Sequence, residues 1–331
     1  MRPFTYQRPV DARAAVAAAS DAGAKFISGG TNLLDLMKLE VERPTALIDI
    51  SRLPFAEIEE LPDGGLRVGA QAKNSDVAAH PYVRAHYGVL SQALLAGASG
   101  QLRNKASVGG NLLQRTRCPY FYDTAADCNK RRPGSGCAAL NGFNRIHAIL
   151  GSSDACIATH PSDMAVAMAA LDADIEVLGA DAAETRVPLA EFYRDPADSP
   201  DIETVLRPGD MITDVSLPPP PPGEQIYRKV RDRASYEFAL VSVAAVVDTD
   251  GETIRAARIA FGGVAHKPWR SREVEAALEG QPATWSTFQA AANAATADAK
   301  GREHNDFKVE LAKRTLCRTL SQATASEESD R

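Results

Sequence analysis

The chain reads Phe26-Ile27-Ser28-Gly29-Gly30-Thr31-Asn32-Leu33 near its N-terminus: an apolar run, a small hydroxyl residue, two glycines and a renewed apolar spacing. This order predicts a strand, a tight turn and the start of a helix over residues 24–38. Paired glycines adopt φ > 0 easily and let bare backbone N–H groups approach a ligand. Such amides at a helix N-terminus suit phosphate oxygens. The alternative is that the glycines serve the turn alone.

A second stretch, Ser107-Val108-Gly109-Gly110-Asn111, repeats the same order of residue types. Two such loops can hold a pyrophosphate from both sides, as a dinucleotide requires. Neither loop has the spacing G-x-G-x-x-G or G-x-x-x-x-G-K-[ST], so the sequence lacks the Rossmann fingerprint and the P-loop. We therefore expect a phosphate cradle of another type, built from two separate segments.

Short strand-like runs alternate with helical patterns around these loops. The expected strands lie at residues 46–50, 66–70 and 174–178, and a helix is expected at 162–173. The five prolines that precede Gly223 predict a stiff connector at 218–223, because proline runs are extended. The alternative is a surface loop within one domain.

The chain beyond the prolines predicts a hairpin and a final helix. Strands are expected at 239–247 and 254–262, with a turn at Asp248-Thr249-Asp250-Gly251, and the helix at 306–321. The sequence thus predicts an α+β domain at 1–217 and a smaller α+β domain at 224–325. A charged tail at 326–331 is expected to be disordered.

Composition excludes two classes of protein. The net charge of −6 over 331 residues, without a long basic run, argues against nucleic-acid binding. The most apolar stretch, residues 164–178, contains three acidic residues and is shorter than the roughly 20 residues of a membrane span.

The N-terminus lacks a signal-peptide pattern, so we expect folding in the cytoplasm. Export to the periplasm could follow on a signal-bearing partner.

Four of the five cysteines, Cys118, Cys128, Cys137 and Cys156, fall in one segment with nine, eight and eighteen intervening residues. Structural zinc usually has close C-x₂₋₄-C pairs, and two disulfides suit a secreted chain. Widely spaced cysteines on a looping segment can hold a [4Fe–4S] cluster. Spacing alone leaves the cluster, zinc or disulfides, and unpaired buried thiols open. Cys317 is expected to be a core thiol.

In the order of these motifs the chain resembles the FAD-binding medium subunits of the xanthine dehydrogenase, or molybdenum hydroxylase, family. Beyond the two glycine loops, the shared pieces are Met37-Lys38, Pro161-Ser162-Asp163, Leu171-Asp172-Ala173, and Phe261-Gly262-Gly263-Val264-Ala265 with Pro268 and Arg270. The resemblance extends over nearly the whole chain. It implies a two-subdomain FAD-binding domain of the PCMH type, then a CO dehydrogenase flavoprotein-like domain with a three-stranded sheet and helices.

The resemblance also implies which residues bind FAD. They are Phe26, Ile27, Ser28, Gly29, Gly30, Thr31, Asn32, Leu33, Ser107, Gly109, Gly110, Asn111, Asp163 and Lys229. Asp163 would reach the ribityl region, or else it only complements a helix start. Lys229 would lie near the flavin, or else it is a solvated charge on a strand. His147 and His160 would contact a cofactor or serve as structural residues.

A narrower group of the family, the bacterial periplasmic aldehyde oxidoreductases, is similar in Arg117-Cys118-Pro119-Tyr120-Phe121-Tyr122-Asp123-Thr124 and Pro133-Gly134-Ser135-Gly136-Cys137. This resemblance implies that the four clustered cysteines ligate a [4Fe–4S] cluster in an insertion at about 115–158. It also implies three partners: a molybdenum cofactor-binding large subunit, a [2Fe–2S] small subunit and an external electron acceptor.

The expected function is therefore electron transfer through FAD within a molybdenum-dependent aldehyde oxidoreductase. We find no catalytic triad or carboxylate pair, so no catalytic residue is expected in this chain. One rival is a self-contained flavin oxidase that binds its own substrate. The other is an iron–sulfur or zinc structural protein whose glycine loops are only turns.

Overall fold

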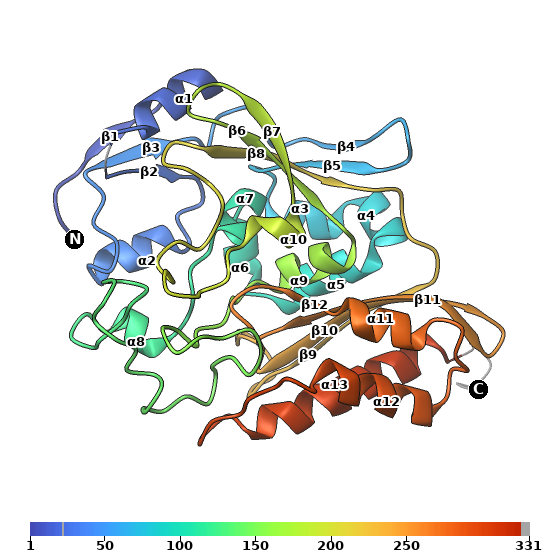
Figure 1. Cartoon of the computed structure of the whole chain (residues 1–331). Coiled ribbons are helices and arrows are strands. Elements are labelled where there is room, and N and C mark those ends of the chain that lie inside the picture. Colours follow the sequence, from blue (N-terminus) through green and yellow to red (C-terminus); the bar gives the residue numbers. More distant parts are fainter. Residues whose placement is uncertain (22, 326–331) are drawn as a thin grey trace.

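A computed structural model of the chain describes residues 1–21 and 23–325. The tail expected at 326–331 lies outside the described residues. Three sheets organise the fold, and Figure 1 shows the first two above the third, with α5 and α9 between them.

The first sheet is parallel and carries the first glycine loop. Its strand order is β1 (Thr5–Gln7), β3 (Ala46–Asp49) and β2 (Ala24–Ile27). Two helices accompany it, α1 (Ala12–Ala19) and α2 (Leu33–Lys38). Asp11 caps α1 by accepting a hydrogen bond from the Ala14 N–H, as expected of an aspartate before a helix.

The second sheet is antiparallel. Its order is β4 (Ile58–Glu60), β5 (Leu66–Gly69), β8 (Met211–Leu217), β6 (Asp174–Leu178) and β7 (Glu184–Pro188). The helices of this part are α3 (Asn74–Ala79), α4 (Pro81–His86), α5 (Gly88–Ala96), α6 (Gly100–Arg103), α7 (Val108–Leu112), α8 (Pro119–Tyr122), α9 (Asp163–Ala170) and α10 (Leu189–Phe192). Strand β8 pairs between β5 and β6, so β5 and β8 are neighbours in this sheet although they lie far apart along the chain.

The third sheet forms the C-terminal part. Its order is β12 (Trp269–Arg270), β11 (Thr253–Gly262), β10 (Val241–Asp250) and β9 (Glu224–Val230), all antiparallel. The three long strands are those of the expected sheet, and the two-residue β12 adds a fourth. The helices α11 (Arg272–Leu278), α12 (Trp285–Ala295) and α13 (Phe307–Ala323) lie together on one side of the sheet (Figure 1).

The central strand β10 is buried on both faces, which joins the two halves of the chain. Ala244 and Val246 belong to the core that includes α5 and α9, whereas Val243 and Ala245 belong to the core under α12 and α13. Alternate residues of a strand point to opposite faces, so one strand serves two cores.

The turn expected at residues 248–251 is wrong by two residues. Strand β10 continues through Asp250 with an irregularity at Asp248/Thr249, and the chain reverses at Gly251 and Glu252. Gly251 has φ 58°, the left-handed conformation that a tight hairpin loop needs. The aspartates are polar enough for a turn, but pairing with β11 keeps them extended.

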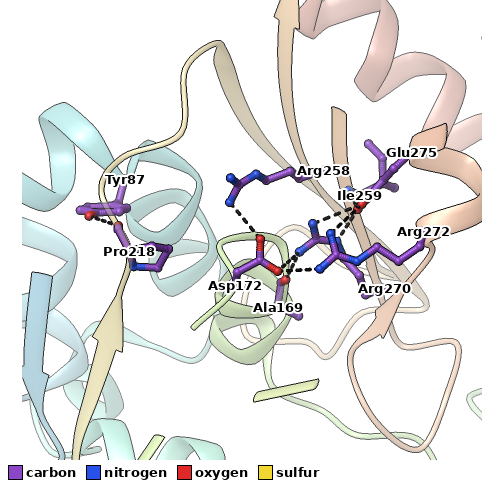
Figure 2. A network of polar contacts seen from close by, with 9 residues as sticks. All are labelled: Tyr87, Ala169, Asp172, Pro218, Arg258, Ile259, Arg270, Arg272 and Glu275. Atoms are coloured by element: carbon purple, nitrogen blue, oxygen red, sulfur yellow. Dashed lines mark hydrogen bonds and ion pairs between the residues drawn. The ribbon is translucent and has the colours of Figure 1, made fainter. Parts of the chain in front are cut away.

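An arginine cluster around Asp172 ties α9 to the C-terminal part (Figure 2). The Asp172 carboxylate lies 3.0 Å from Arg258 Nη1, 3.1 Å from Arg270 Nη1 and 2.8 Å from Arg272 Nη2. Arg270 also donates to the Ala169 carbonyl at the end of α9. The helix ends earlier than the expected residue 173 because Asp172 adopts φ 55°.

We predict that Asp172→Asn lowers the free energy of unfolding by about 1–2 kcal/mol, because three guanidinium groups lose their shared carboxylate at a half-exposed site. Asparagine tolerates the left-handed backbone, so the change tests charge alone. Asp181→Asn is the control, since Asp181 forms an ion pair with the exposed Arg207. Urea unfolding checks both variants, and equal midpoints would contradict the prediction.

None of the helices in the described part of the chain combines the length and apolarity that crossing a bilayer requires.

Candidate functional site

The first glycine loop lies between β2 and α2 and forms one wall of a cleft of about 740 Å³. Gly30 has φ 71°, so the turn needs its glycine. A Cβ added at Gly29 would stand 2.2 Å from the Lys105 carbonyl oxygen, so this backbone packs directly against the segment before the second loop. Both glycines are therefore required by geometry as well as by any ligand.

The amides of this loop are available to a ligand. Within the described residues, no protein acceptor is found for the backbone N–H groups of Gly29, Gly30, Thr31 and Asn32. Four successive amides beside a cleft form the arrangement that binds phosphate oxygens. The volume of the cleft also fits a dinucleotide-sized ligand, since small-molecule sites span roughly 300–1,000 Å³.

The second glycine loop contributes a different kind of surface. The N–H of Gly109 donates to the Ala70 carbonyl (2.9 Å), and that of Gly110 to Ser107 Oγ (3.3 Å). These amides start α7, so they are committed within the protein. A Cβ at Gly110 would meet only Ser107 Oγ at 3.1 Å, and Gly110 lines the cleft. The loop thus supplies close approach of the backbone, while the first loop supplies free donors.

Most residues expected to bind FAD line this one cleft. They are Phe26, Ile27, Ser28, Gly29, Gly30, Thr31, Asn32, Leu33, Ser107, Gly109 and Gly110. Asn111 is not among the lining residues. Its side-chain oxygen instead accepts a hydrogen bond from Ser162 Oγ at 2.7 Å, which fixes the start of α9 next to the second loop.

Asp163 and Lys229 lie together but outside the lining of the cleft. Lys229 Nζ is 2.8 Å from Asp163 Oδ2, and Tyr227 donates its hydroxyl to Asp163 Oδ1 at 2.6 Å. All three side chains are buried, and burial raises the pKa of Tyr227. In this structure the pair joins α9 to β9, and its contact with FAD remains a prediction.

A second wall of the cleft was not anticipated from the sequence. It consists of Tyr193, Arg194, Pro196, residues 200–204, residues 206–208 and residues 210–212. Arg115 and His160 also line the cleft. These residues carry no common motif, and only the position of Arg115 just after the second glycine loop offered a signal.

His160 is held as a neutral ring at the cleft. Its Nδ1 accepts from the Ser162 N–H and its Nε2 faces the Leu112 carbonyl, both at 3.4 Å. Burial lowers the pKa of His160 to about 4. The ring also lies 4.6 Å from that of Tyr193, so it supports the cleft wall.

The four clustered cysteines surround one small pocket next to this cleft. Cys118, Cys128, Cys137 and Cys156 line it, and all are free thiols. Cys128 and Cys137 pair through a backbone bridge, which brings the two middle cysteines side by side. Cys317 lies in a different core, on α13, as expected of a packing residue. No three His, Cys, Asp or Glu side chains of the described residues are arranged as ligands of one metal ion.

The donor set of this pocket, four cysteine thiols, is the one that a [4Fe–4S] cluster requires. Burial raises the pKa of the Cys118 thiol to about 12 and raises that of Cys156. Thiolates are therefore unfavourable here unless a metal centre compensates their charge. The N–H of Ala158 points at Cys156 Sγ (3.5 Å) and His147 Nε2 lies 3.1 Å from Cys118 Sγ. Burial lowers the pKa of His147 to about 4, so its ring is neutral.

Comparison with known families matches both halves of the chain. Residues 2–220 match the family described as "FAD binding domain in molybdopterin dehydrogenase". Residues 225–323 match the "CO dehydrogenase flavoprotein C-terminal domain".

Curated relatives match the chain over nearly its full length. The chain is 58% identical over 327 residues to the aldehyde oxidoreductase FAD-binding subunit PaoB of Escherichia coli, covering 98% of this chain and 99% of that protein. It is 26% identical to the carbon monoxide dehydrogenase medium chain of Hydrogenophaga pseudoflava, covering 97% of each. A solved structure of carbon monoxide dehydrogenase from the same organism superposes with a TM-score of 0.75 over 97% of each chain.

Proposed function

The chain belongs to the FAD-binding medium subunits of the molybdenum hydroxylase family, and we propose that it carries electrons through FAD in a molybdenum-dependent aldehyde oxidoreductase. The observation that carries this proposal is the 58% identity to PaoB over the length of both proteins. In the proposed complex, electrons pass from the molybdenum and [2Fe–2S] subunits to this chain. An external acceptor then takes them from FAD.

The two glycine loops of the cleft would contribute to FAD binding in different ways. The amides of Gly29 to Asn32 would donate to the diphosphate, and Gly109 and Gly110 would allow it to approach the start of α7. When bound, FAD accepts two electrons and can release them singly. The protein itself needs no general base, since its role is to position the cofactor and exclude water from it.

We further propose that Cys118, Cys128, Cys137 and Cys156 hold a [4Fe–4S] cluster. Their common pocket and the adjacent buried Lys130 support this assignment. A cluster with four thiolates is anionic, and a buried lysine lowers the cost of that charge. The cluster would serve as a further relay or brace the segment that carries it.

The proposed partners are a molybdenum cofactor-binding large subunit and a [2Fe–2S] small subunit. We place folding of the chain in the cytoplasm, with periplasmic location only if a signal-bearing partner exports the assembled complex.

We predict that the chain, tagged and expressed with its neighbouring subunits, co-purifies with both partners. The complex should contain molybdenum and FAD in comparable amounts and oxidise aldehydes, whereas the chain alone should bind FAD and oxidise no organic substrate. Subunit composition, metal analysis and the flavin spectrum check this. An isolated chain that oxidises aldehydes by itself would favour the self-contained flavin oxidase.

A further inference from the structure

Glu203 lies where the FAD cleft meets the four-cysteine pocket. It lines the cleft, and each oxygen of its carboxylate contacts a different cation. Oε2 accepts from Arg115 Nε at 2.6 Å, and Oε1 accepts from Lys130 Nζ at 2.7 Å. The Glu203 side chain is 28% exposed, so the contacts are partly shielded from water.

Arg115 connects Glu203 to the first glycine loop. Its backbone N–H donates to Asn32 Oδ1 at 2.9 Å, and Asn32 is one of the residues with a free amide at the cleft. Its guanidinium also contacts Glu42 and lies 4.7 Å over the ring of Phe121. Phe121 is fully buried in α8 and lines the cysteine pocket. Arg115 thus contacts both sites.

Lys130 connects Glu203 to the cysteines. It follows Cys128 by two residues, and it lines both the cleft and the cysteine pocket. Its side chain is only 8% exposed, and its ammonium group also donates to the Pro200 carbonyl at 2.8 Å. The same lysine therefore fixes the cysteine segment to the residue 200–204 wall of the cleft.

We propose that Glu203 is a positioning residue that couples occupancy of the four-cysteine pocket to the affinity of the cleft for FAD. This rests on the proposed iron–sulfur assignment. A cluster would order the segment around Cys128 and so hold Lys130 in place. Lys130 then fixes Glu203, and Glu203 in turn fixes Arg115 and the part of the cleft wall to which it belongs. Without the cluster the segment is less ordered and Lys130 no longer fixes the wall. FAD binding must then order the wall as well, and this entropic cost lowers the affinity for FAD.

The experiment measures this coupling as a ratio of two dissociation constants. The full chain is purified without oxygen, and FAD binding is followed by flavin fluorescence before and after loading with iron and sulfide. Loading of the wild type should tighten FAD binding by about tenfold, within the usual range of coupling between sites. In Glu203→Gln the ratio should fall below about twofold.

Control variants separate coupling from direct contact with FAD. Lys130→Met should lose the ratio as Glu203→Gln does, while Lys130→Arg should retain most of it because the charge remains. Glu59→Gln removes an exposed pair with Arg67 and should keep the wild-type ratio. If Glu203 only touched FAD, its replacement would weaken binding equally in both states and leave the ratio unchanged.

The outcomes also distinguish this inference from the proposed function. A wild-type chain that takes up iron and sulfide but shows the same FAD affinity in both states would overturn the coupling and leave the cluster assignment intact. An unchanged ratio in Glu203→Gln would do the same. A wild-type chain that takes up no iron would overturn both.

Discussion

Gly30→Val should yield a folded chain that has lost FAD. The residue holds φ 71°, and a Cβ there would stand 2.8 Å from Leu34 Cδ1. The left-handed conformation costs a non-glycine residue roughly 1–2 kcal/mol, and each lost hydrogen bond to a charged phosphate costs roughly 1.5–3 kcal/mol more. We therefore expect FAD affinity to fall by at least about a hundredfold. The flavin absorbance of the purified chain measures this directly.

Gly110→Val should also lower FAD content, by a different route. Gly110 lies in α7 without a left-handed backbone, so a side chain there acts by occupying the space where the backbone meets the ligand. Gly64→Val is the matched control for strain. Gly64 has φ 86° in the loop between β4 and β5, and nothing lies within 4 Å of an added Cβ. Near-stoichiometric FAD in Gly30→Val and Gly110→Val would refute the cradle.

Replacing any one of Cys118, Cys128, Cys137 or Cys156 by Ser should remove most of the iron and acid-labile sulfide bound to the chain. The four thiols line one pocket, so a cluster lacking one ligand would have an open, labile iron site. The loss should destabilise the segment from Cys118 to Cys156. Because that segment connects the second glycine loop to α9, FAD content and subunit assembly should fall with it.

Cys317→Ser provides the control for this series. Cys317 is a free thiol packed in the C-terminal core, so its replacement should leave iron unchanged and cost about 1 kcal/mol of packing. Iron and sulfide are to be measured on the isolated chain, so that the clusters of partner subunits do not contribute. If the anaerobically purified wild type holds free thiols and neither iron nor zinc, the cysteines are structural.

Several helices and strands could be inferred from local sequence signals, whereas the family was inferred from the resemblance of the motifs in their order along the chain. Paired glycines report a backbone requirement, and hydrophobic periodicity reports which face of a strand or helix is buried. These signals are confined to a few neighbouring residues, so one sequence suffices to read them. The two strands of the C-terminal hairpin and the turn-to-helix arrangement at Gly29 and Gly30 are confirmed on this basis, whereas the third long strand was expected only from the family resemblance.

The second wall of the cleft and its connection to the cysteines depended on tertiary structure. Glu203 meets Arg115 across 88 positions of the chain and Lys130 across 73, and no periodicity links residues so far apart. The ion pair of Asp163 and Lys229 also depends on tertiary structure, because Asp163 at the start of α9 and Lys229 in β9 are 66 positions apart in the chain. Local patterns record the conformation of each segment. The ion pairs depend instead on how β8 and the C-terminal sheet pack against the first part of the chain. A buried charge is costly without a partner, so the packed structure brings oppositely charged groups together.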